Sequence, residues 1–475
     1  MENIEKLITQ DKYKHIFDMA KKAGDLGLKE GLKVYIVGGV VRDLLLARDV
    51  QDLDLMVEGD GIYFAKKLAG DIGVRKIVPF KKFGTALIPH RDFQIEVASS
   101  RSESYENDSR SPKKVVFTSL EEDLKRRDFT INAMAMDTHP ENFGKIYDPF
   151  NGQDDLSNGL LKTPLDPKKT FSDDPLRMMR AAYFSSKLSF KLDSDCRAAI
   201  KDSSKRISIV SWERIRDELI KTLSTAKPSI GLVIMQKTGL LETVFPEIDV
   251  MYDMDQSPEW HHKDIFAHTL QVVDNAAKLT DKMEIRFAAL VHDIAKPTTR
   301  KIDPVKGYTF HGHDAIGERM LHKVAKRLRL SNQLASYIKK LTLLHLRPIA
   351  IAKSEVSDSA VRRLMVAAGE EIEDLMTLCR ADITTKNPNR VKRYLKNFDL
   401  VEEKMKTVMD KDSAKTFLSP IRGKEIMKMF NLDPGKVVGE IKSEIEEAIL
   451  DGKIENSREE AIEYLSKIKN RYVQN

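Results

Sequence analysis

One change along the chain constrains its fold more than any other feature of the sequence. Between residues 33 and about 150, the short β-type runs KVYIV, LDLMV, TALIP and FQIEVAS alternate with helical stretches. After DPFNGQDD, at residues 148–155, such runs nearly vanish, and the rest of the 475-residue chain has the periodicity of helices. The sequence therefore predicts an α+β head with a mixed sheet, followed by an all-α body. Residues 1–30 are predicted to form amphipathic helices.

Composition sets further bounds on the protein. Its length predicts more than one domain, and its 41% hydrophobic and 32% charged residues are typical of folded chains. The 79 basic and 73 acidic residues leave a net charge of +6, which suits a polyanionic partner without identifying one. Cys196 and Cys379 stand far apart and indicate neither a disulfide framework nor a zinc cluster. Since the first residues are charged throughout and no apolar run could span a membrane, we expect a cytoplasmic protein with no signal peptide and no membrane partner.

A candidate phosphate-binding turn lies at VYIVGGVVRDLLL, residues 34–46. Here a β-type run meets Gly38 and Gly39 and continues into a helical pattern, so backbone N–H groups could approach an anion. Arg42 follows closely, and its guanidinium suits phosphate oxygens. Taken alone, however, two glycines are more typical of a simple tight turn than of a phosphate site.

Two aspartates in the run DLDLMV raise the question of a metal site. On a strand, Asp52 and Asp54 point to the same face, whereas Leu53 lies on the other. Two neighbouring carboxylates are costly unless a cation lies between them, and together with the candidate phosphate-binding turn just upstream they predict Mg²⁺. Taken alone, the pair could be a chance alternation of acids in an apolar run. Glu96, on the predicted strand FQIEVAS, is the candidate for a third catalytic carboxylate. The alternative for Glu96 is a surface acid on an edge strand.

Two polar clusters follow. In KRRDFTINAMAM, at residues 125–136, charged side chains precede an apolar run that we interpret as helical, and they could simply cap or solvate a helix. In FSDDPLRMMR, at residues 171–180, we expect a helix in which Asp174 and Arg177 share a face. Carboxylate acceptors and guanidinium donors together could satisfy the edge of cytosine or adenine. The alternative is a local ion pair.

The order of these motifs resembles one family closely. GGVVRD, DLDL, RRDFTINAMAM, DPFNG and DDPLRMMRAAYF are similar to the signature motifs of class II tRNA nucleotidyltransferases, the CCA-adding enzymes, a family that includes bacterial poly(A) polymerases. The segment IRGKEIMKMFNLDPGKVVGEIKSEIEEAILDGKI is similar to the family's C-terminal segment. The resemblance implies a head of the polymerase-β type. One departure is small, because this chain has Asp173–Asp174 where the family often has Glu-Asp.

The resemblance also implies a role for each matching residue. Asp52 and Asp54 fall on the catalytic metal ligands, and the other residues fall on nucleotide-binding positions. These are Gly38, Gly39 and Arg42 in the triphosphate turn, Arg127, Asp128 and Asn132 near ribose and phosphates, and Asp174, Arg177 and Arg180 in the helix whose Asp174–Arg177 pair reads the base.

The middle of the chain holds a second candidate site. Eight of the eleven histidines lie between residues 261 and 345. His292 and Asp293 stand together in an apolar helical pattern, where a buried pair needs hydrogen-bond partners or a metal. A satisfied core pair is the simpler interpretation of the dipeptide by itself.

In its wider context, LVHDIAK resembles the HD superfamily of metal-dependent phosphohydrolases. The resemblance implies a ligand set of His268, His292, Asp293 and Asp382, with His313 and His345 available for a second metal. Imidazole and carboxylate together favour a transition metal such as Ni²⁺, Mn²⁺ or Fe²⁺ over Mg²⁺ alone. Because all six residues are present, we expect an active hydrolase acting on nucleotide or RNA ends. The remaining histidines of this segment, His261, His262, His311 and His322, are expected at the surface or next to the site.

Together, these features predict addition of CMP and AMP from CTP and ATP to the 3′ end of tRNA. The predicted domains are a nucleotidyltransferase head (1–156), a nucleotide-selecting neck (157–250), an HD domain (251–385) and a Lys-rich, tRNA-binding tail (386–475). Alternatives on the same motifs are a poly(A) polymerase or an enzyme adding only CC or A. A more distant alternative is a nucleotide phosphohydrolase with an RNA-binding head. The oligomeric state stays open.

Overall fold

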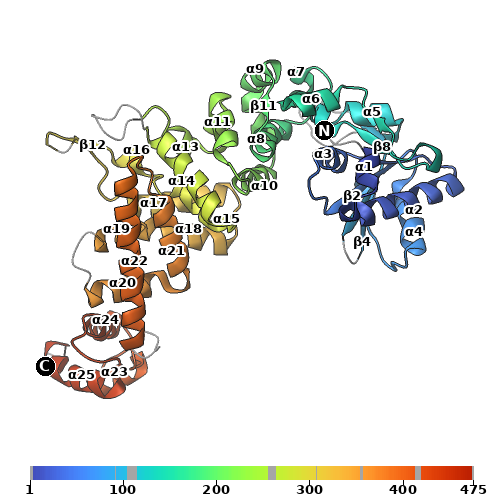
Figure 1. Cartoon of the computed structure of the whole chain (residues 1–475). Helices are drawn as coiled ribbons and strands as arrows, with labels where there is room; N and C mark the ends of the chain where they lie inside the picture. The colour runs from blue at the N-terminus through green and yellow to red at the C-terminus, as the bar shows by residue number, and fades with distance from the viewer. Residues whose placement is uncertain are drawn as a thin grey trace. The chain divides into compact units, whose positions relative to one another are not determined.

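The computed structural model describes residues 4–90, 93–103, 115–254, 264–305, 307–352, 357–411 and 419–472 (Figure 1). The chain forms two compact units, Met1–Pro246 and Glu247–Asn475. The predicted four-domain division is finer than this split and stays a prediction.

The first unit is built around a mixed seven-stranded sheet with the strand order β3-β4-β5-β2-β1-β8-β9. Strands β2 and β5 run parallel, and the other neighbouring strands pair antiparallel. The strands are β1 (Val34–Val37), β2 (Asp52–Val57), β3 (Val78–Phe80), β4 (Thr85–Pro89), β5 (Gln94–Ser99), β8 (Ala135–Asp137) and β9 (Ile146–Tyr147). The predicted mixed sheet is confirmed, and the four β-type runs of the sequence form β1, β2, β4 and β5.

Helices alternate with the strands of the large sheet and predominate in the chain after β9. Those of the sheet region are α1 (Ile4–Ile8), α2 (Lys14–Glu30), α3 (Gly39–Leu45), α4 (Gly61–Asp71) and α5 (Leu120–Lys125). The following helices are α6 (Gly152–Asn158), α7 (Pro167–Asp173), α8 (Leu176–Leu188), α9 (Ser194–Ser203), α10 (Trp212–Leu223), α11 (Ser229–Lys237), α12 (Leu240–Val244) and α13 (Pro246–Asp249). Two strand pairs lie outside the large sheet, β6 (Arg101–Glu103) with β7 (Val115–Phe117) and β10 (Leu160–Leu161) with β11 (Lys191–Leu192). The polar segment RSESYENDSRSPKK, residues 101–114, is expected from its sequence to form a functional loop, and its residues 104–114 lie outside the described part of the chain.

One secondary-structure prediction is wrong. The apolar run of KRRDFTINAMAM is not helical: it forms the short 3₁₀ helix η3 (Thr130–Asn132) and then strand β8. Strand β8 pairs with β1 on one side and β9 on the other, and all three of its residues are buried. A continuous apolar run fits a buried strand as well as a buried helix, so only the pairing partners decide between them.

The predicted N-terminal helices are confirmed as α1 and α2. Helix α2 buries Ile16, Phe17 and Met19 and packs closely on the edge of the loop after β8. At Gly24 the approach is so close that a Cβ atom would lie 1.8 Å from the carbonyl oxygen of Thr138. The contact therefore requires glycine.

The second unit is helical, as predicted. Its helices are α14 (Ile265–Leu279), α15 (Met283–Val291), α16 (Lys296–Thr299), α17 (His313–Arg327), α18 (Asn332–Leu344), α19 (Leu346–Ile351), α20 (Asp358–Ala368), α21 (Ile372–Ala381), α22 (Pro388–Lys411), α23 (Gly423–Phe430), α24 (Lys436–Leu450) and α25 (Arg458–Tyr472). A single antiparallel pair among the described residues, β12 (Lys301–Asp303) with β13 (Gly307–Thr309), interrupts them. The remaining short 3₁₀ helices of the chain are η1 (Asp11–Tyr13), η2 (Lys81–Phe83), η4 (Pro140–Asn142), η5 (Ser204–Ile209) and η6 (Gly369–Glu371).

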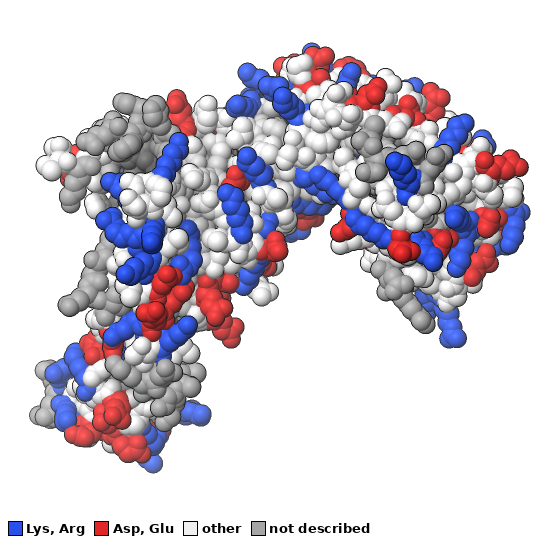
Figure 2. Space-filling model, in the orientation of Figure 1, with Lys and Arg blue, Asp and Glu red and all other residues white. Residues whose placement is uncertain are grey.

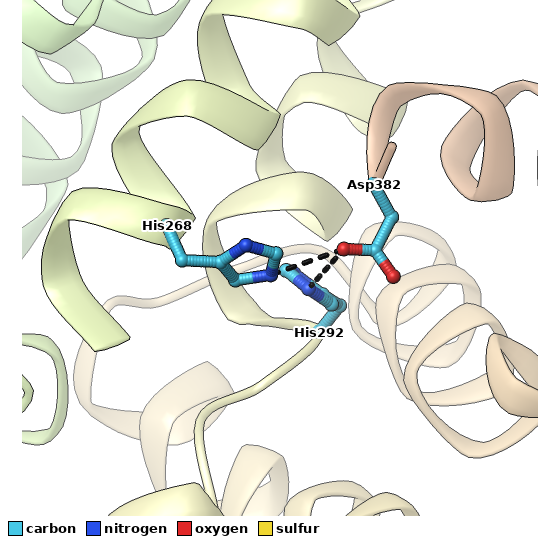
Figure 3. Close-up of side chains that lie close together, drawn as sticks. All are labelled: His268, His292 and Asp382. Atoms are coloured by element: carbon cyan, nitrogen blue, oxygen red, sulfur yellow. Dashed lines mark ion pairs between the residues drawn. The ribbon is translucent and has the colours of Figure 1, made fainter. Parts of the chain in front are cut away.

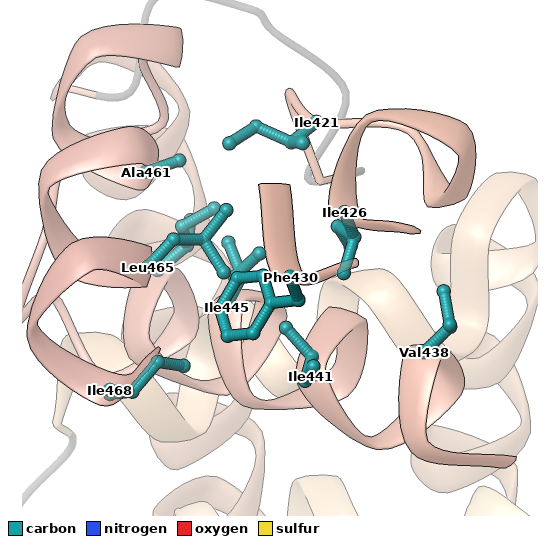
Figure 4. Close-up of a cluster of buried hydrophobic side chains, with 10 residues drawn as sticks. Ile421, Ile426, Phe430, Val438, Ile441, Ile445, Ala461, Leu465 and Ile468 are labelled. Carbon is teal, nitrogen blue, oxygen red and sulfur yellow. The ribbon is translucent and has the colours of Figure 1, made fainter. Parts of the chain in front are cut away.

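The last three helices share a core of their own. Side chains from α23, α24 and α25 converge there, among them Phe430, Ile445 and Leu465, each at most 3% exposed (Figure 4). None of the helices in the described part of the chain combines the length and apolar composition needed to cross a membrane.

Candidate active sites

The three candidate catalytic carboxylates of the head lie on two adjacent strands. Asp52 and Asp54 are on β2, and Glu96 is on β5, directly opposite Asp54 in the parallel register. Side chains opposite each other on paired strands share a face, so all three carboxylates project from one side of the sheet. Since β5 lies between β4 and β2, the alternative of an edge-strand position for Glu96 is wrong.

The ionisation of Asp54 reflects this crowding. Its burial and the neighbouring carboxylates of Glu96 and Asp52 raise its pKa to about 6, against the opposing effects of Arg127 and Arg42. Like charges held this close favour either a proton or a cation. Carboxylate oxygens are the ligands that Mg²⁺ prefers, so the residues present suit that ion.

The glycine turn brings an arginine over this acidic face. Gly38 has φ +71°, and a Cβ atom there would lie 2.8 Å from Nη1 of Arg127 and 4.0 Å from Oδ2 of Asp54. Arg42 is only 2% exposed and is bound within the protein: its Nε and Nη2 donate to Asp43 at 2.8 Å, and its Nη1 donates to Asn132 at 2.6 Å. Arg127 thus faces the glycine turn, whereas the guanidinium of Arg42 is held by Asp43 and Asn132.

A buried network continues from Asn132 to the helices beyond the sheet. The Nδ2 of Asn132 donates to Oδ1 of Asp128 at 3.0 Å, and Nε of Arg180 on α8 donates to Oδ2 at 2.7 Å. Although burial opposes ionisation, Arg180 and Asn132 hold the pKa of Asp128 below its ordinary value. Asp128 is therefore an anion that links the RRD segment to α8.

The pair Asp174 and Arg177 lies where α7 ends and α8 begins. The prediction that both residues stand on one helix is wrong: α8 starts at Leu176, and Asp174 has extended dihedral angles before Pro175. Its Oδ1 accepts from the backbone N–H of Leu176 at 3.2 Å, which satisfies a donor at the helix start. Arg177 donates to two backbone carbonyls, those of Arg126 and, at 3.3 Å, Thr170.

The candidate residues of the head line one cleft of about 960 Å³. The twelve predicted head residues that it contains are Gly38, Gly39, Arg42, Asp52, Asp54, Glu96, Arg127, Asp128, Asn132, Asp174, Arg177 and Arg180. Sequence reasoning assigned no role to eight further polar residues of the lining, Thr85, Arg126, Tyr183, Lys187, Arg214, Asp217, Glu218 and Lys221. On α10, Arg214, Glu218 and Lys221 recur at a helical spacing of three or four residues, a pattern that a solvated helix face also shows.

The second unit brings the six candidate HD ligands together. The Nε2 atoms of His268 and His292 lie 3.0 and 3.6 Å from Oδ1 of Asp382 (Figure 3). The same two atoms lie 3.3 and 3.1 Å from Oδ2 of Asp293. On the other side of Asp293, its Oδ1 lies 3.3 Å from Nε2 of His313 and 3.8 Å from Nε2 of His345. Asp293 therefore stands between two groups of potential ligands.

Each of these histidines turns the same ring nitrogen toward the cluster. The Nδ1 atoms of these rings contact backbone carbonyls at 2.6–2.8 Å: His292 contacts Ala289, His313 contacts Phe310 and His345 contacts Thr342. In His268, Nδ1 contacts the Thr384 hydroxyl at 3.0 Å instead. An Nδ1–H that donates to a carbonyl leaves Nε2 as a lone-pair donor, which is the usual arrangement around a metal.

The acidic and imidazole groups of this cluster also fit a bound metal. Nε2 of His292 is buried and has no hydrogen bond of good geometry among the described residues, although Oδ2 of Asp293 lies 3.1 Å from it. Despite burial, Asp293 raises the pKa of His292, while burial and His292 lower the pKa of His345 to about 4. A proton on His292 and a divalent cation would therefore compete for the same acids.

The structure adds one cation that sequence reasoning overlooked, and it places the remaining histidines. Lys296, three residues after Asp293, brings Nζ to 2.6 Å from Oδ2 of Asp293. His311 and His322 are exposed and outside the cluster, as expected, while His261 and His262 lie outside the described residues. His292 itself lies at the end of α15, not inside a helix.

Three family models match the chain in succession. They are the "Poly A polymerase head domain" at residues 34–162, the "Probable RNA and SrmB-binding site of polymerase A" at residues 189–252 and the "HD domain" at residues 265–387. The Multifunctional CCA protein of Vibrio campbellii is 32% identical over 370 residues, which cover 74% of this chain and 85% of that protein. The chain belongs to the multifunctional CCA protein family.

Solved structures of CCA-adding enzymes share the fold of this multifunctional CCA protein family member. The enzyme of Bacillus stearothermophilus in complex with CTP is 24% identical, with a TM-score of 0.65 and coverage of 98% of both chains. The Thermotoga maritima enzyme complexed with tRNA is 22% identical, with a TM-score of 0.62 and coverage of 98% of this chain and 99% of that one. The predicted family, fold class and nucleotidyltransferase activity with a fused HD domain are confirmed.

Proposed function

We propose that this member of the multifunctional CCA protein family adds CMP and AMP, taken from CTP and ATP, to the 3′ end of tRNA. One observation carries the proposal: a single cleft joins the carboxylates of β2 and β5 to the Asp174–Arg177 pair at the start of α8. The first group suits metal-assisted attack on a triphosphate, and the second suits reading of a base. The names of the relatives point to the same reaction.

In this mechanism Asp52 and Asp54 hold Mg²⁺, with Glu96 as the third carboxylate. Bound there, Mg²⁺ lowers the pKa of an attacking hydroxyl and stabilises the charge of the triphosphate. The chain itself orients the substrate: Arg127 and the backbone N–H groups of the glycine turn hold the triphosphate. The tRNA 3′-hydroxyl would then attack the α-phosphate beside the acidic face of the sheet, and pyrophosphate would leave as the bond between the α- and β-phosphates breaks.

The start of α8 selects the base. Cytosine and adenine each present an amino donor beside a ring-nitrogen acceptor, which complements a carboxylate and a guanidinium. Guanine and uracil leave buried groups of such a site unpaired, which is costly. Asp174 and Arg177 are each already held by backbone contacts, so little ordering is needed when a nucleotide binds.

Incubation of unmodified tRNA lacking its terminus with CTP and ATP, separately and together, tests the proposal. We expect addition of CMP residues with CTP alone and a complete terminus with both nucleotides. Long tails from ATP alone would identify a poly(A) polymerase, and a product that stops at CC would identify a partial enzyme. Turnover of free nucleotides without extension would instead support a phosphohydrolase with an RNA-binding head.

The metal assignment has its own test. Asp52→Ala should abolish nucleotide incorporation and leave tRNA affinity nearly unchanged, because that carboxylate is proposed to act on the metal and not on the RNA. Filter binding and incorporation assays on the same preparation separate the two effects. Full incorporation by the variant would refute the assignment. Binding itself should weaken with salt, as phosphate contacts by a Lys-rich tail do.

We also propose a phosphohydrolase activity on nucleotide or RNA ends for the HD cluster. His268, His292, Asp293 and Asp382 would hold one divalent metal and His313 and His345 would complete a second site, with Ni²⁺, Mn²⁺ or Fe²⁺ favoured by the mixed donors. A metal in such a site supplies a hydroxide nucleophile near neutral pH. A metal bound to Asp293 would neutralise that carboxylate, and the ammonium group of Lys296 could then bind a phosphate oxygen of the substrate. Since the proposed substrate is tRNA, we place the enzyme in the cytoplasm.

A further inference from the structure

A fully buried acid lies behind the nucleotide cleft without lining it. Asp123 on α5 is 1% exposed, and its two carboxylate oxygens hold two different arginines. Oδ1 accepts from Nε and Nη2 of Arg126 at 3.1 and 2.5 Å, and Oδ2 accepts from Nε and Nη2 of Arg127 at 3.3 and 3.0 Å. One carboxylate therefore fixes both guanidinium groups through paired hydrogen bonds.

The two arginines face the cleft, whereas the acid does not. The side chains of Arg126 and Arg127 are 27% and 21% exposed, and both line the cleft. Adjacent guanidinium groups repel each other, and without a shared anion they would separate into the open space of the cleft. Burial opposes ionisation, but the two arginines hold the pKa of Asp123 below its ordinary range, so the anion is present at neutral pH.

The two arginines held by Asp123 make contacts at both ends of the proposed nucleotide site. Arg127 extends toward the triphosphate end, where its Nη1 lies over Gly38 close to Asp54. The backbone carbonyl of Arg126 accepts a hydrogen bond from Nη2 of Arg177, the arginine proposed to read the base. The same short turn at the end of α5 thus touches the residues proposed for phosphate binding and for base selection.

We infer that Asp123 is a positioning residue for the incoming nucleotide. Asp123 fixes Arg127 directly, and it fixes Arg177 through the main chain of Arg126. This inference rests on the proposed nucleotidyl transfer. It deepens that proposal because it assigns one acid to two separate tasks, triphosphate binding and discrimination between bases. A core ion pair with only a structural role would serve neither task.

The isosteric variant Asp123→Asn tests the inference in the full-length enzyme. We expect the KM for CTP and for ATP to rise about tenfold, the effect of losing about 1.4 kcal/mol of binding, while kcat changes less than threefold. Misincorporation of UTP relative to CTP should rise about tenfold as well, because Arg177 loses a fixed neighbour. The KM for tRNA should stay unchanged.

The chain offers a matched control on the same helix. Glu122 is 50% exposed and pairs with Lys125 at 3.3 Å, so Glu122→Gln removes a neighbouring carboxylate without touching either arginine. Its kinetic constants should stay within twofold of the wild type. An equal change in both variants would reveal a general charge effect and overturn the inference.

A second variant covers the case in which the first does not fold. Asp123→Glu keeps the anion but displaces it by one methylene group, so it should keep the selectivity for CTP over UTP better than Asp123→Asn does. Unchanged nucleotide KM values in folded Asp123→Asn would overturn the inference, and so would a failure of both variants to fold, since the acid would then serve folding alone. Absence of incorporation by the wild type would instead refute the proposed function.

Discussion

Asp54 stands beside Glu96 and Asp52 on the acidic face of the sheet. The three carboxylates repel one another, and either a proton on Asp54 or a bound cation relieves that repulsion. Burial and the two neighbouring acids raise the pKa of Asp54 to about 6 from an ordinary value of 3.8. The folded protein therefore binds this proton more tightly than the unfolded chain does. Stability contributed by the proton is present at low pH and is lost as the pH rises through about 6.

Removal of the charge should therefore stabilise the metal-free protein at high pH. In EDTA, Asp54→Asn is expected to melt at a higher temperature than the wild type at pH 8, and the difference should shrink as the pH falls toward 4. Thermal denaturation across this range, followed by circular dichroism, measures the effect. Mg²⁺ should then raise the melting temperature of the wild type and leave the variant unchanged. A difference independent of pH would show that Asp54 is not crowded.

Among the elements, α2 depends most closely on one residue for its position against the sheet. At Gly24, any side chain would meet the main chain of Thr138, and backbone atoms cannot move aside as the end of a flexible side chain can. Gly70, near the end of α4, offers the contrast, because a Cβ atom there would meet nothing within 4 Å. A substitution at Gly24 therefore tests how α2 packs, whereas the same substitution at Gly70 tests the helix propensity of α4.

We expect opposite effects from the same substitution at these two glycines. Gly24→Ala should lower the free energy of unfolding by about 1–3 kcal/mol or more, because α2 must shift away from the loop after β8. Gly70→Ala should raise it by about 0.4–1 kcal/mol, because alanine restricts the unfolded chain and favours a helix. Urea denaturation at 25 °C measures both. Equal changes of the same sign would contradict the packing seen at Gly24.

At the scale of the whole molecule, two units carry two chemically different sites. Carboxylates and arginines make up the head site, while imidazoles and carboxylates make up the HD cluster. On the face shown in Figure 2, basic and acidic side chains are interspersed over both units, in keeping with the modest net charge of +6. Binding of tRNA through this face is therefore expected to depend on local groups of cations.

The separation of the sites predicts that the two activities can be lost independently. His292→Ala should abolish metal-dependent phosphohydrolysis and leave CMP and AMP incorporation intact, whereas Asp54→Ala should do the reverse. Both activities are measured on the same preparations, with Mg²⁺ for incorporation and a series of Ni²⁺, Mn²⁺ and Fe²⁺ for hydrolysis. Phosphatase activity lost in Asp54→Ala would place it in the head. No hydrolysis by the wild type with any divalent metal would refute the HD assignment.

The family and most of the candidate site residues follow from the sequence alone, because they depend on local spacing. Two acids on alternate positions of a strand share a face in any sheet, and a glycine pair between a strand and a helix turns the chain in any context. The motifs that carry the resemblance are likewise short and continuous. The change from β-type runs to helical periodicity predicted the α+β head and the helical body, and the resemblance implied roles for both sets of candidate ligands.

Other features were decided only by tertiary structure, because they depend on partners distant in the sequence or on burial. Ala135 and Met136, the end of the run AMAM, became part of strand β8 because β1 and β9 offered hydrogen bonds on both sides, and Glu96 became an interior neighbour of Asp54 through strand order. Lys296 and Asp123 have partners only three or four residues away, but they look like ordinary solvated charges until folding buries Asp293 and Asp123. Local patterns thus specify which groups a site contains, whereas burial and strand pairing specify what each group touches.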